Sequence, residues 1–328
     1  MTAATAIRHL LDVDEWSLND IQHLLEIAET LRGWSDPAAL RSLLRGAVVV
    51  TLFYENSTRT RVSFELAAKT LGADVVNISA SASSVTKGET IRDTVNTLDA
   101  LGANIIVMRH EHSGAPNTAA RWSKSSIINA GDGWRAHPSQ ALLDLLTLQS
   151  IFGSVAGKKI VIAGDIVHSR VARSNIYTLT TAGAEVILCG PPTMLPKTFA
   201  AAYPDRKVSV TFSIEEALAR ADAVMALRIQ KERMTGGALP SLREYRQYFG
   251  LTADRMQAYA HLPILHPGPM NEGVELDPEV AHGAQSYVEH QVANGPFVRM
   301  AILLWAARKD DALLNMVRLA NTTGGAEA

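Results

Sequence analysis

The sequence has little cysteine, almost no net charge and no long apolar run. Cys189 is its single cysteine, which excludes an intrachain disulfide framework and any cysteine-based metal cluster. Lys and Arg total 31 against 33 Asp and Glu, a net charge of −2, so the charge balance does not favour non-specific binding to nucleic acid or to an anionic membrane. No apolar stretch is long enough to cross a bilayer, and the opening MTAATAIRHLLDVDEW lacks a basic segment followed by an apolar one. We therefore expect a cytoplasmic protein with neither a membrane nor a nucleic-acid partner.

The distribution of apolar residues predicts an α/β protein of two domains. The chain has 328 residues, 47% hydrophobic and 20% charged, as in an ordinary soluble protein. Short apolar runs alternate with amphipathic segments, which is typical of parallel sheets covered by helices on both faces. The expected strands are Ala47–Phe53, Asp74–Ile78, Asn104–Met108, Ser126–Asn129, Lys159–Ala163, Glu185–Cys189, Val208–Phe212, Ala223–Ala226 and Leu262–Leu265. The expected helices are Leu18–Arg32, Pro37–Leu44, Arg59–Leu71, Thr90–Leu101, Ser139–Phe152, Arg170–Ala182, Ile214–Arg220, Ala253–Ala260 and about Phe297–Met316, with Ser17 and Asp36 as N-caps of the first two.

Hydroxyl and guanidinium groups follow the first expected strand. Ser57, Thr58 and Thr60 alternate with Arg59 and Arg61 at a strand-to-helix turn. Backbone N–H groups, the helix dipole and a bidentate arginine are what a phosphate dianion needs. Ser and Thr are also common as simple N-caps, so these residues alone fit phosphate binding and helix capping about equally.

Two other segments of the first half place polar groups after expected strands. Arg109 directly follows Asn104–Met108, although a lone arginine is usually a surface charge. The neighbouring His110 and His112 lack the third ligand of a metal site, and we interpret them as loop residues.

His137 precedes Pro138 at the start of an expected helix. That position disfavours the imidazolium, so we expect a neutral ring able to donate a hydrogen bond to a carbonyl oxygen. Gln140 lies one turn further on and can reach the same pocket. A histidine at a helix start is, however, more often structural. The segment Ser79–Thr90, rich in small residues and hydroxyls, contains only the Lys87-Gly88 fragment of a phosphate-binding loop, so by itself it reads as a linker.

The second half places an arginine after each of two expected strands. Arg170 ends the segment Gly164–Arg170, and Arg228 begins the segment Arg228–Arg233. Two such arginines suit a dicarboxylate. A dinucleotide site is excluded because no Gly-x-Gly-x-x-Gly follows the strand. His266-Pro267-Gly268-Pro269 forms a rigid turn after the last expected strand, which alone would mean little.

Taken together, these segments resemble the aspartate carbamoyltransferases of the aspartate/ornithine carbamoyltransferase superfamily. The resemblance covers about His9 to Arg308, and its motifs occur in order: Ser57–Arg61, Lys87–Thr90, Val107–His110, His137–Gln140, Gly164-Asp165 with Arg170, Arg228–Arg233 and His266–Pro269. Members of the superfamily that use ornithine carry a Ser-Met-Gly segment in the second domain and a His-Cys-Leu-Pro turn. This chain has neither motif. In one respect it departs from many members, which carry a basic residue where this chain has Met270.

The resemblance implies two doubly wound parallel-sheet domains with the active site in the cleft between them. Residues 1–147, with the helix from about 297 to 328, would bind carbamoyl phosphate, and residues 148–296 would bind aspartate. The reaction would give N-carbamoyl-L-aspartate and phosphate, an early step of pyrimidine (UMP) synthesis, without a metal or an organic cofactor. The phosphate would be held by Ser57, Thr58, Arg59, Thr60 and Arg109. The carbamoyl oxygen would be polarised by Thr60, Arg109 and His137, and its amide fixed by Gln140 and the backbone of Gly268 and Pro269.

For the second substrate, the resemblance implies Lys87, Arg170, Arg228 and Gln230 as aspartate-binding residues. Ser83 and Lys87 would come from a neighbouring subunit, which makes a homotrimer the minimal unit, with regulatory chains or dihydroorotase as possible further partners. Glu55 is expected to pair with an arginine of the second domain, such as Arg233. The alternatives are a carbamoyltransferase for ornithine or a related amine, a catalytically silent scaffold, and an anion-binding module. A catalytically silent scaffold is disfavoured because the catalytic set is complete, with Arg59, Thr60, Arg109 and His137 all present.

Overall fold

The computed structural model describes residues 7–79, 89–229 and 241–316, and the chain divides into two compact units. The first unit comprises Met1–Glu15, Asn19–Ser139 and Gly295–Ala328, and the second comprises Trp16–Leu18 and Gln140–Asn294. Apart from the short segment Trp16–Leu18, the chain passes between them within helix α6 (Pro138–Phe152) and again within helix α12 (Val288–Ala306).

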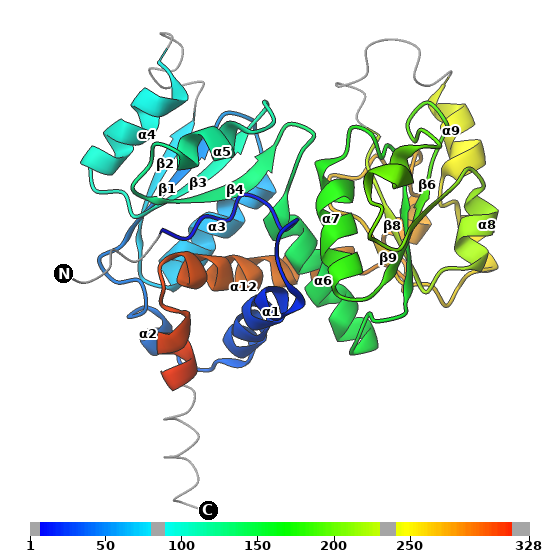
Figure 1. Cartoon of the computed structure of the whole chain (residues 1–328). Coiled ribbons are helices and arrows are strands. Elements are labelled where there is room, and N and C mark those ends of the chain that lie inside the picture. Colours follow the sequence, from blue (N-terminus) through cyan, green and yellow to red (C-terminus); the bar gives the residue numbers. More distant parts are fainter. Residues whose placement is uncertain (1–6, 80–88, 230–240, 317–328) are drawn as a thin grey trace, which may run out of the picture. The chain divides into compact units, whose positions relative to one another are not determined.

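The first unit is built on a four-stranded parallel sheet of order β2-β1-β3-β4. Helices α4 and α5 lie on one face of this sheet and α3 and α12 on the other (Figure 1). Val50 and Met108, for example, pack with Val95 of α4 and Ala119 of α5. Because both faces are covered, the central strands β1 and β3 are buried along nearly their whole length and mainly apolar rather than alternating. The elements are α1 (Leu18–Gly33), α2 (Pro37–Leu40), β1 (Val48–Phe53), α3 (Thr58–Thr70), β2 (Asp74–Ser79), α4 (Ile91–Ala100), β3 (Ile105–His110), α5 (Ala115–Ala120) and β4 (Ser126–Asp132).

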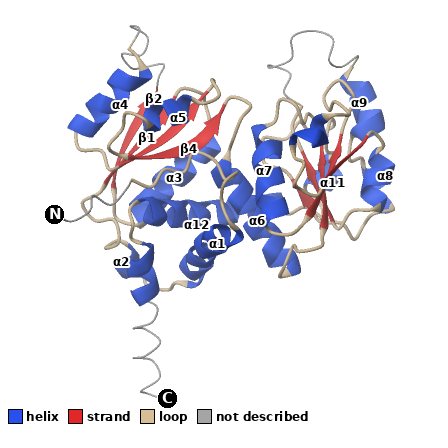
Figure 2. Ribbon diagram, in the orientation of Figure 1, coloured by secondary structure: helices blue, strands red, loops and turns tan. Residues whose placement is uncertain are grey.

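The second unit is built on a five-stranded parallel sheet of order β7-β6-β5-β8-β9. One face packs against α8, α10 and α11 through a core that includes Val161, Ile187 and Val224, and α7 lies on the other face (Figure 2). The elements are β5 (Lys159–Ala163), α7 (Arg170–Thr181), β6 (Glu185–Cys189), the 3₁₀ helix η3 (Phe199–Ala202), β7 (Val208–Thr211), α8 (Ile214–Ala219), β8 (Ala223–Ala226), α9 (Leu242–Phe249), α10 (Ala253–Gln257), β9 (Ile264–Leu265) and α11 (Pro278–Ala281).

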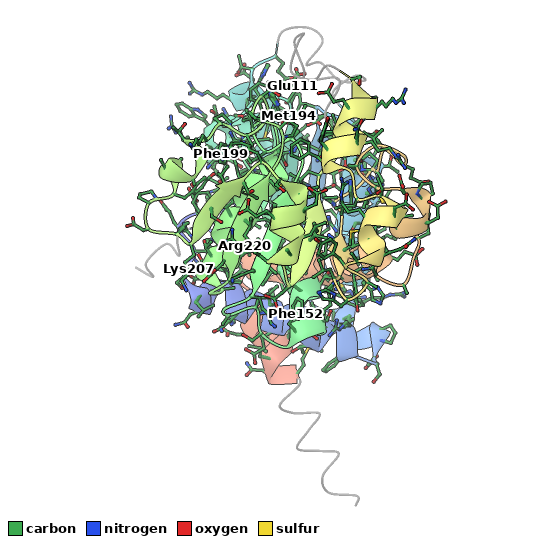
Figure 3. All side chains as sticks on the ribbon, turned by 90° about the vertical axis from the view of Figure 1, so that its right-hand side faces the viewer. Glu111, Phe152, Met194, Phe199, Lys207 and Arg220 are labelled. Atoms are coloured by element: carbon green, nitrogen blue, oxygen red, sulfur yellow. The ribbon has the colours of Figure 1, made fainter. Side chains whose placement is uncertain are left out.

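Both sheets are doubly wound. In the first, the chain begins at β1, adds β2 on one side and then β3 and β4 on the other; in the second it begins at β5, adds β6 and β7, and then β8 and β9 on the other side. Figure 3 shows the two ends of the strands of the second sheet. Met194, which follows the carboxyl end of β6, lies above Lys207 and Arg220, which precede the amino ends of β7 and β8. Open α/β sheets bind ligands beyond the carboxyl ends of the strands where the winding reverses. The segments at those points follow β1 and β3 in the first unit and β5 and β8 in the second.

The structure confirms the α/β class and the nine expected strands, with shifts of one to three residues at some ends. Asp36 caps α2 as predicted, since its Oδ1 accepts from the N–H groups of Ala38 (2.9 Å) and Ala39 (3.2 Å). The last helix, predicted over about Phe297–Met316, starts earlier and is interrupted: α12 starts at Val288, passes through Pro296 and ends at Ala306, and residues 310–316 form a further helical turn. A proline lacks the backbone donor of a helix interior, so the sequence around Pro296 gives little indication that a helix runs through it. Among the described residues, no helix is long and apolar enough to span a membrane.

Candidate active site

Arg109 ties together the carboxyl ends of three strands in the first unit. It lies in β3 and its carbonyl accepts a hydrogen bond from the N–H of Tyr54, just after β1 (2.9 Å). Its Nη1 donates to the carbonyl oxygen of Ala130 in β4 (3.1 Å). The segment that follows β1, with Ser57 to Arg61, therefore shares one edge of the sheet with this guanidinium.

Glu55 provides the second partner of the same guanidinium. Its Oε1 lies 3.1 Å from Nη2 of Arg109, and the two side chains are 26% and 11% exposed. This pair was not predicted from the sequence. Glu55 was expected to pair with an arginine of the second domain, such as Arg233, which lies outside the described residues, so that pairing stays a prediction. A fixed fork at the strand end is suited to a planar or tetrahedral anion.

The turn after β1 does not use its first hydroxyl to cap the helix. Ser57 occupies the N-cap position of α3 with an extended backbone, but its side chain makes no capping hydrogen bond. Thr58 and Arg59 are exposed, and Thr60 is buried. Of the two interpretations of this turn, simple capping by Ser57 is not what the structure shows.

His137 lies at the carboxyl edge of the same sheet, between β4 and α6. It is buried, and its Nδ1 lies 3.5 Å from Oγ of Ser139 in the first turn of α6. The preceding loop is held by Asp132, whose Oδ1 accepts from Nδ2 of Asn129 (2.8 Å) and from the N–H of Ala136 (3.1 Å). The ring therefore stands on a fixed loop at a helix start.

The interpretation of His110 as a loop residue is wrong. It is the last residue of β3 and is buried, and burial lowers the pKa of its imidazole. Its Nδ1 accepts the N–H of His112 (2.9 Å). A strand that continues two residues past its apolar run gives no separate signal in the sequence. Among the described residues, no three His, Cys, Asp or Glu side chains come together to hold a metal ion.

In the second unit, Arg170 and Arg228 follow neighbouring strands. Leu227, next to Arg228, donates its N–H to the carbonyl oxygen of Ala163 at the end of β5 (2.8 Å). The backbones approach so closely here that a Cβ on Gly164 (φ 136°) would lie 2.9 Å from the carbonyl oxygen of Leu227. Arg170 is the first residue of α7 and is buried. Both arginines therefore emerge at one edge of the second sheet.

The turn after β9 is fixed by the buried side chain of His266. Its Nδ1 accepts the N–H of Gly268 (2.8 Å), and its Nε2 lies 3.3 Å from Oε1 of Glu275. A ring nitrogen that accepts identifies the neutral tautomer in which Nε2 donates to the carboxylate. The Gly268–Pro269 peptide bond is cis. Nδ2 of Asn271 donates to the carbonyl oxygen of Ile229 (3.3 Å), which links the turn to the segment that holds Arg228.

Gln140 is buried in α6, and its Nε2 donates to Oδ1 of Asp144 (2.8 Å). Met270 packs partly buried against the core of the second unit. Three candidate residues, Ser83, Lys87 and Gln230, lie outside the described residues.

Two models of known protein domains match this chain, one over each half. Residues 8–150 match the model of the aspartate/ornithine carbamoyltransferase carbamoyl-P binding domain, and residues 156–306 match that of the Asp/Orn binding domain. The chain therefore belongs to the aspartate/ornithine carbamoyltransferase family. Within it, the chain is 53% identical over 300 residues to the aspartate carbamoyltransferase catalytic subunit of Roseiflexus sp. (strain RS-1), covering 90% of this chain and 94% of the relative.

Solved structures from both branches of the family resemble the fold. An aspartate transcarbamoylase from Trypanosoma cruzi, in complex with carbamoyl aspartate and phosphate, has a TM-score of 0.80 and 32% identity over 90% of this chain and 95% of its own. The ornithine carbamoyltransferase from Thermus thermophilus has the same TM-score of 0.80 with 28% identity, over 92% of this chain and 99% of its own. The backbone alone therefore does not separate the two second substrates.

Proposed function

We propose that this chain transfers the carbamoyl group of carbamoyl phosphate to the amino group of L-aspartate, giving N-carbamoyl-L-aspartate and phosphate in pyrimidine synthesis. The observation that carries the proposal is the placement of Arg109 with the Ser57–Arg61 turn at the winding reversal of the first sheet, and of Arg170 and Arg228 at that of the second. One edge offers donors for a phosphate, and the other offers two guanidinium groups for a dicarboxylate.

The first unit would bind the phosphate and the carbamoyl oxygen of carbamoyl phosphate. Ser57, Thr58, Arg59, Thr60 and Arg109 hold the phosphate in this proposal, and Thr60, Arg109 and His137 donate to the carbamoyl oxygen. Gln140 and the backbone of Gly268 and Pro269, which belong to the second unit, accept from the carbamoyl amide. Support comes from Ser57, whose side chain makes no cap bond, and from the fixed fork of Arg109.

The second unit would bind aspartate through Arg170 and Arg228, together with Gln230 and Lys87. Ornithine carries an amine where aspartate carries its second carboxylate, and an arginine repels an ammonium group. Ser83 and Lys87 would be supplied by a neighbouring subunit of a homotrimer.

In the reaction, the aspartate amine attacks the carbamoyl carbon, a C–N bond forms and the C–O bond to phosphate breaks. Negative charge develops on the carbamoyl oxygen, so fixed donors there lower the barrier. The departing phosphate accepts the proton released by the amine. The remaining rate enhancement comes from orienting the two bound anions, worth up to roughly 7–11 kcal/mol in well-aligned cases.

The test is product formation from carbamoyl phosphate with L-aspartate and, in parallel, with L-ornithine, using the wild type and Arg59→Ala. We expect carbamoylation of aspartate that is lost in the variant. Turnover with ornithine alone would move the second substrate and leave the phosphate site standing. Absence of turnover with either amine would refute the proposed function.

A further inference from the structure

The side chain of Gln140 in the second unit is hydrogen-bonded to a buried carboxylate, that of Asp144. Asp144 is 0% exposed and lies one helical turn after Gln140 in α6. Its Oδ1 accepts from Nε2 of Gln140 (2.8 Å) and from Nε2 of Gln291 (2.7 Å), and its Oδ2 accepts from Nδ2 of Asn175 (2.8 Å). Burying a carboxyl group is costly unless its hydrogen bonds are made, so this cluster is an organised polar network rather than ordinary packing.

The carboxylate determines which way each glutamine amide faces. An ionised carboxylate only accepts hydrogen bonds, whereas an amide has a donating end and an accepting end. Because Asp144 takes the NH₂ end of Gln140, the Oε1 of Gln140 is turned away from it. An amide without such a partner would present either end to a ligand at similar cost.

The same carboxylate reaches the turn after β9. Gln291 gives its NH₂ to Asp144 and accepts the backbone N–H of His266 on its Oε1 (2.9 Å). His266 in turn accepts the N–H of Gly268 (2.8 Å). One carboxylate therefore orients a side-chain carbonyl in α6 and anchors the backbone of the Gly268–Pro269 turn.

We infer that Asp144 is a positioning residue that makes the site select an NH₂ group next to the phosphate, by holding Gln140 with its carbonyl oxygen toward the ligand and by anchoring the Gly268–Pro269 turn through Gln291. The inference rests on the proposed function, in which Gln140 and that turn accept from the carbamoyl amide. The chemistry recognised is an acyl phosphate whose acyl carbon carries a hydrogen-bond donor.

The test compares three ligands by calorimetry on the full chain: carbamoyl phosphate, acetyl phosphate, which replaces the NH₂ by a methyl group, and inorganic phosphate. The wild type is expected to prefer carbamoyl phosphate over acetyl phosphate. In Asp144→Leu, an apolar variant of similar size, that preference falls about tenfold or more, the equivalent of one buried hydrogen bond, while the affinity for inorganic phosphate stays unchanged.

Two variants separate positioning from general damage. Asp144→Asn keeps an oxygen for Gln140 and Gln291, and Oδ1 of Asn175, which is buried without a hydrogen-bond partner, can turn to accept its NH₂. This variant should recover most of the preference. Asn175→Leu removes a hydrogen bond from the same carboxylate on its other oxygen, so it should lower the melting temperature and leave the preference intact.

A folded Asp144→Leu that keeps the wild-type preference, an Asp144→Asn as impaired as Asp144→Leu, or an equal loss in Asn175→Leu would each overturn the inference. If Asp144→Leu does not fold, Gln291→Met replaces it: loss of the preference supports the anchoring of the turn, and full retention refutes it. A wild type that binds carbamoyl phosphate without preferring it to acetyl phosphate refutes the positioning role alone. A wild type that binds no carbamoyl phosphate refutes the proposed function itself.

Discussion

Replacing Arg109 by lysine separates geometry from charge in the phosphate site. The ammonium group keeps the positive charge, but it cannot donate to the carbonyl oxygen of Ala130 and to Glu55 in the fixed directions of the guanidinium fork. Two effects follow. The developing charge on the carbamoyl oxygen loses an aligned donor, which costs about 10²–10³ in rate. The buried carbonyl of Ala130 loses a hydrogen bond, which costs about 1–3 kcal/mol of stability.

Arg299→Lys is the matched control because Arg299 is also a buried arginine of the first unit. Its Nη1 donates to Oγ of Ser63 (2.8 Å), and its guanidinium lies over the ring of Phe64. This variant should lose stability of a similar size but retain its rate. The assay is the initial rate at varied carbamoyl phosphate, together with urea denaturation of both variants. An Arg109→Lys enzyme within about threefold of the wild-type kcat/KM, against the 10²–10³ expected, would refute the role of the fork.

Two further outcomes follow from single side chains. Ser57→Ala should weaken carbamoyl phosphate binding with almost no loss of stability, because Ser57 makes no cap bond, whereas Ser213→Ala, which removes the cap of α8, should cost about 1 kcal/mol with unchanged kinetics; equal stability losses in calorimetry would contradict this. Burial raises the pKa of the Asp12 carboxyl from 3.8 to about 7. Between these pH values the folded chain holds a proton that the unfolded chain has released. The free energy of unfolding therefore falls as the pH rises through this window and levels off above it. Asp12→Asn should therefore be more stable than the wild type at pH 8 by about 1–4 kcal/mol and lose that advantage below about pH 4, and parallel pH profiles of urea unfolding would disprove the assignment.

The strands and the segments after them could be predicted from the sequence because buried parallel strands are continuous apolar runs. The polar residues that follow such runs, among them Arg109 and Arg170, must then lie at the carboxyl edge of a sheet. The helices α5, α9 and α11 were missed, two of them because they are short and all because their apolar faces are brief. The start of α12 was misplaced by nine residues because Pro296 lies inside this helix, at a position where prolines are uncommon.

Only part of the hydrogen-bond network around Asp144 could be predicted from the sequence. Gln140 and Asp144 are four residues apart on a helix, a spacing that places them on one face and that could have been noticed. Gln291 lies 147 positions from Asp144, and no local pattern links the two. Likewise, the pair of Glu55 with Arg109 depends on the order of strands in the folded sheet. Local chemistry can be predicted from the sequence, whereas partnerships between distant segments appear only when the topology is known.

The single cysteine has a practical consequence for measuring the second unit. Cys189 ends β6 with none of its surface exposed, and burial raises the pKa of its thiol to about 12. Thiol reagents attack the thiolate, so the folded unit should be inert to them at neutral pH, whereas an opened one reacts as an ordinary cysteine does. The rate at which Cys189 reacts with a colorimetric disulfide reagent therefore measures how often the second unit opens in the unmodified protein. Comparing this rate with and without dicarboxylate ligands shows how strongly each ligand stabilises the folded unit.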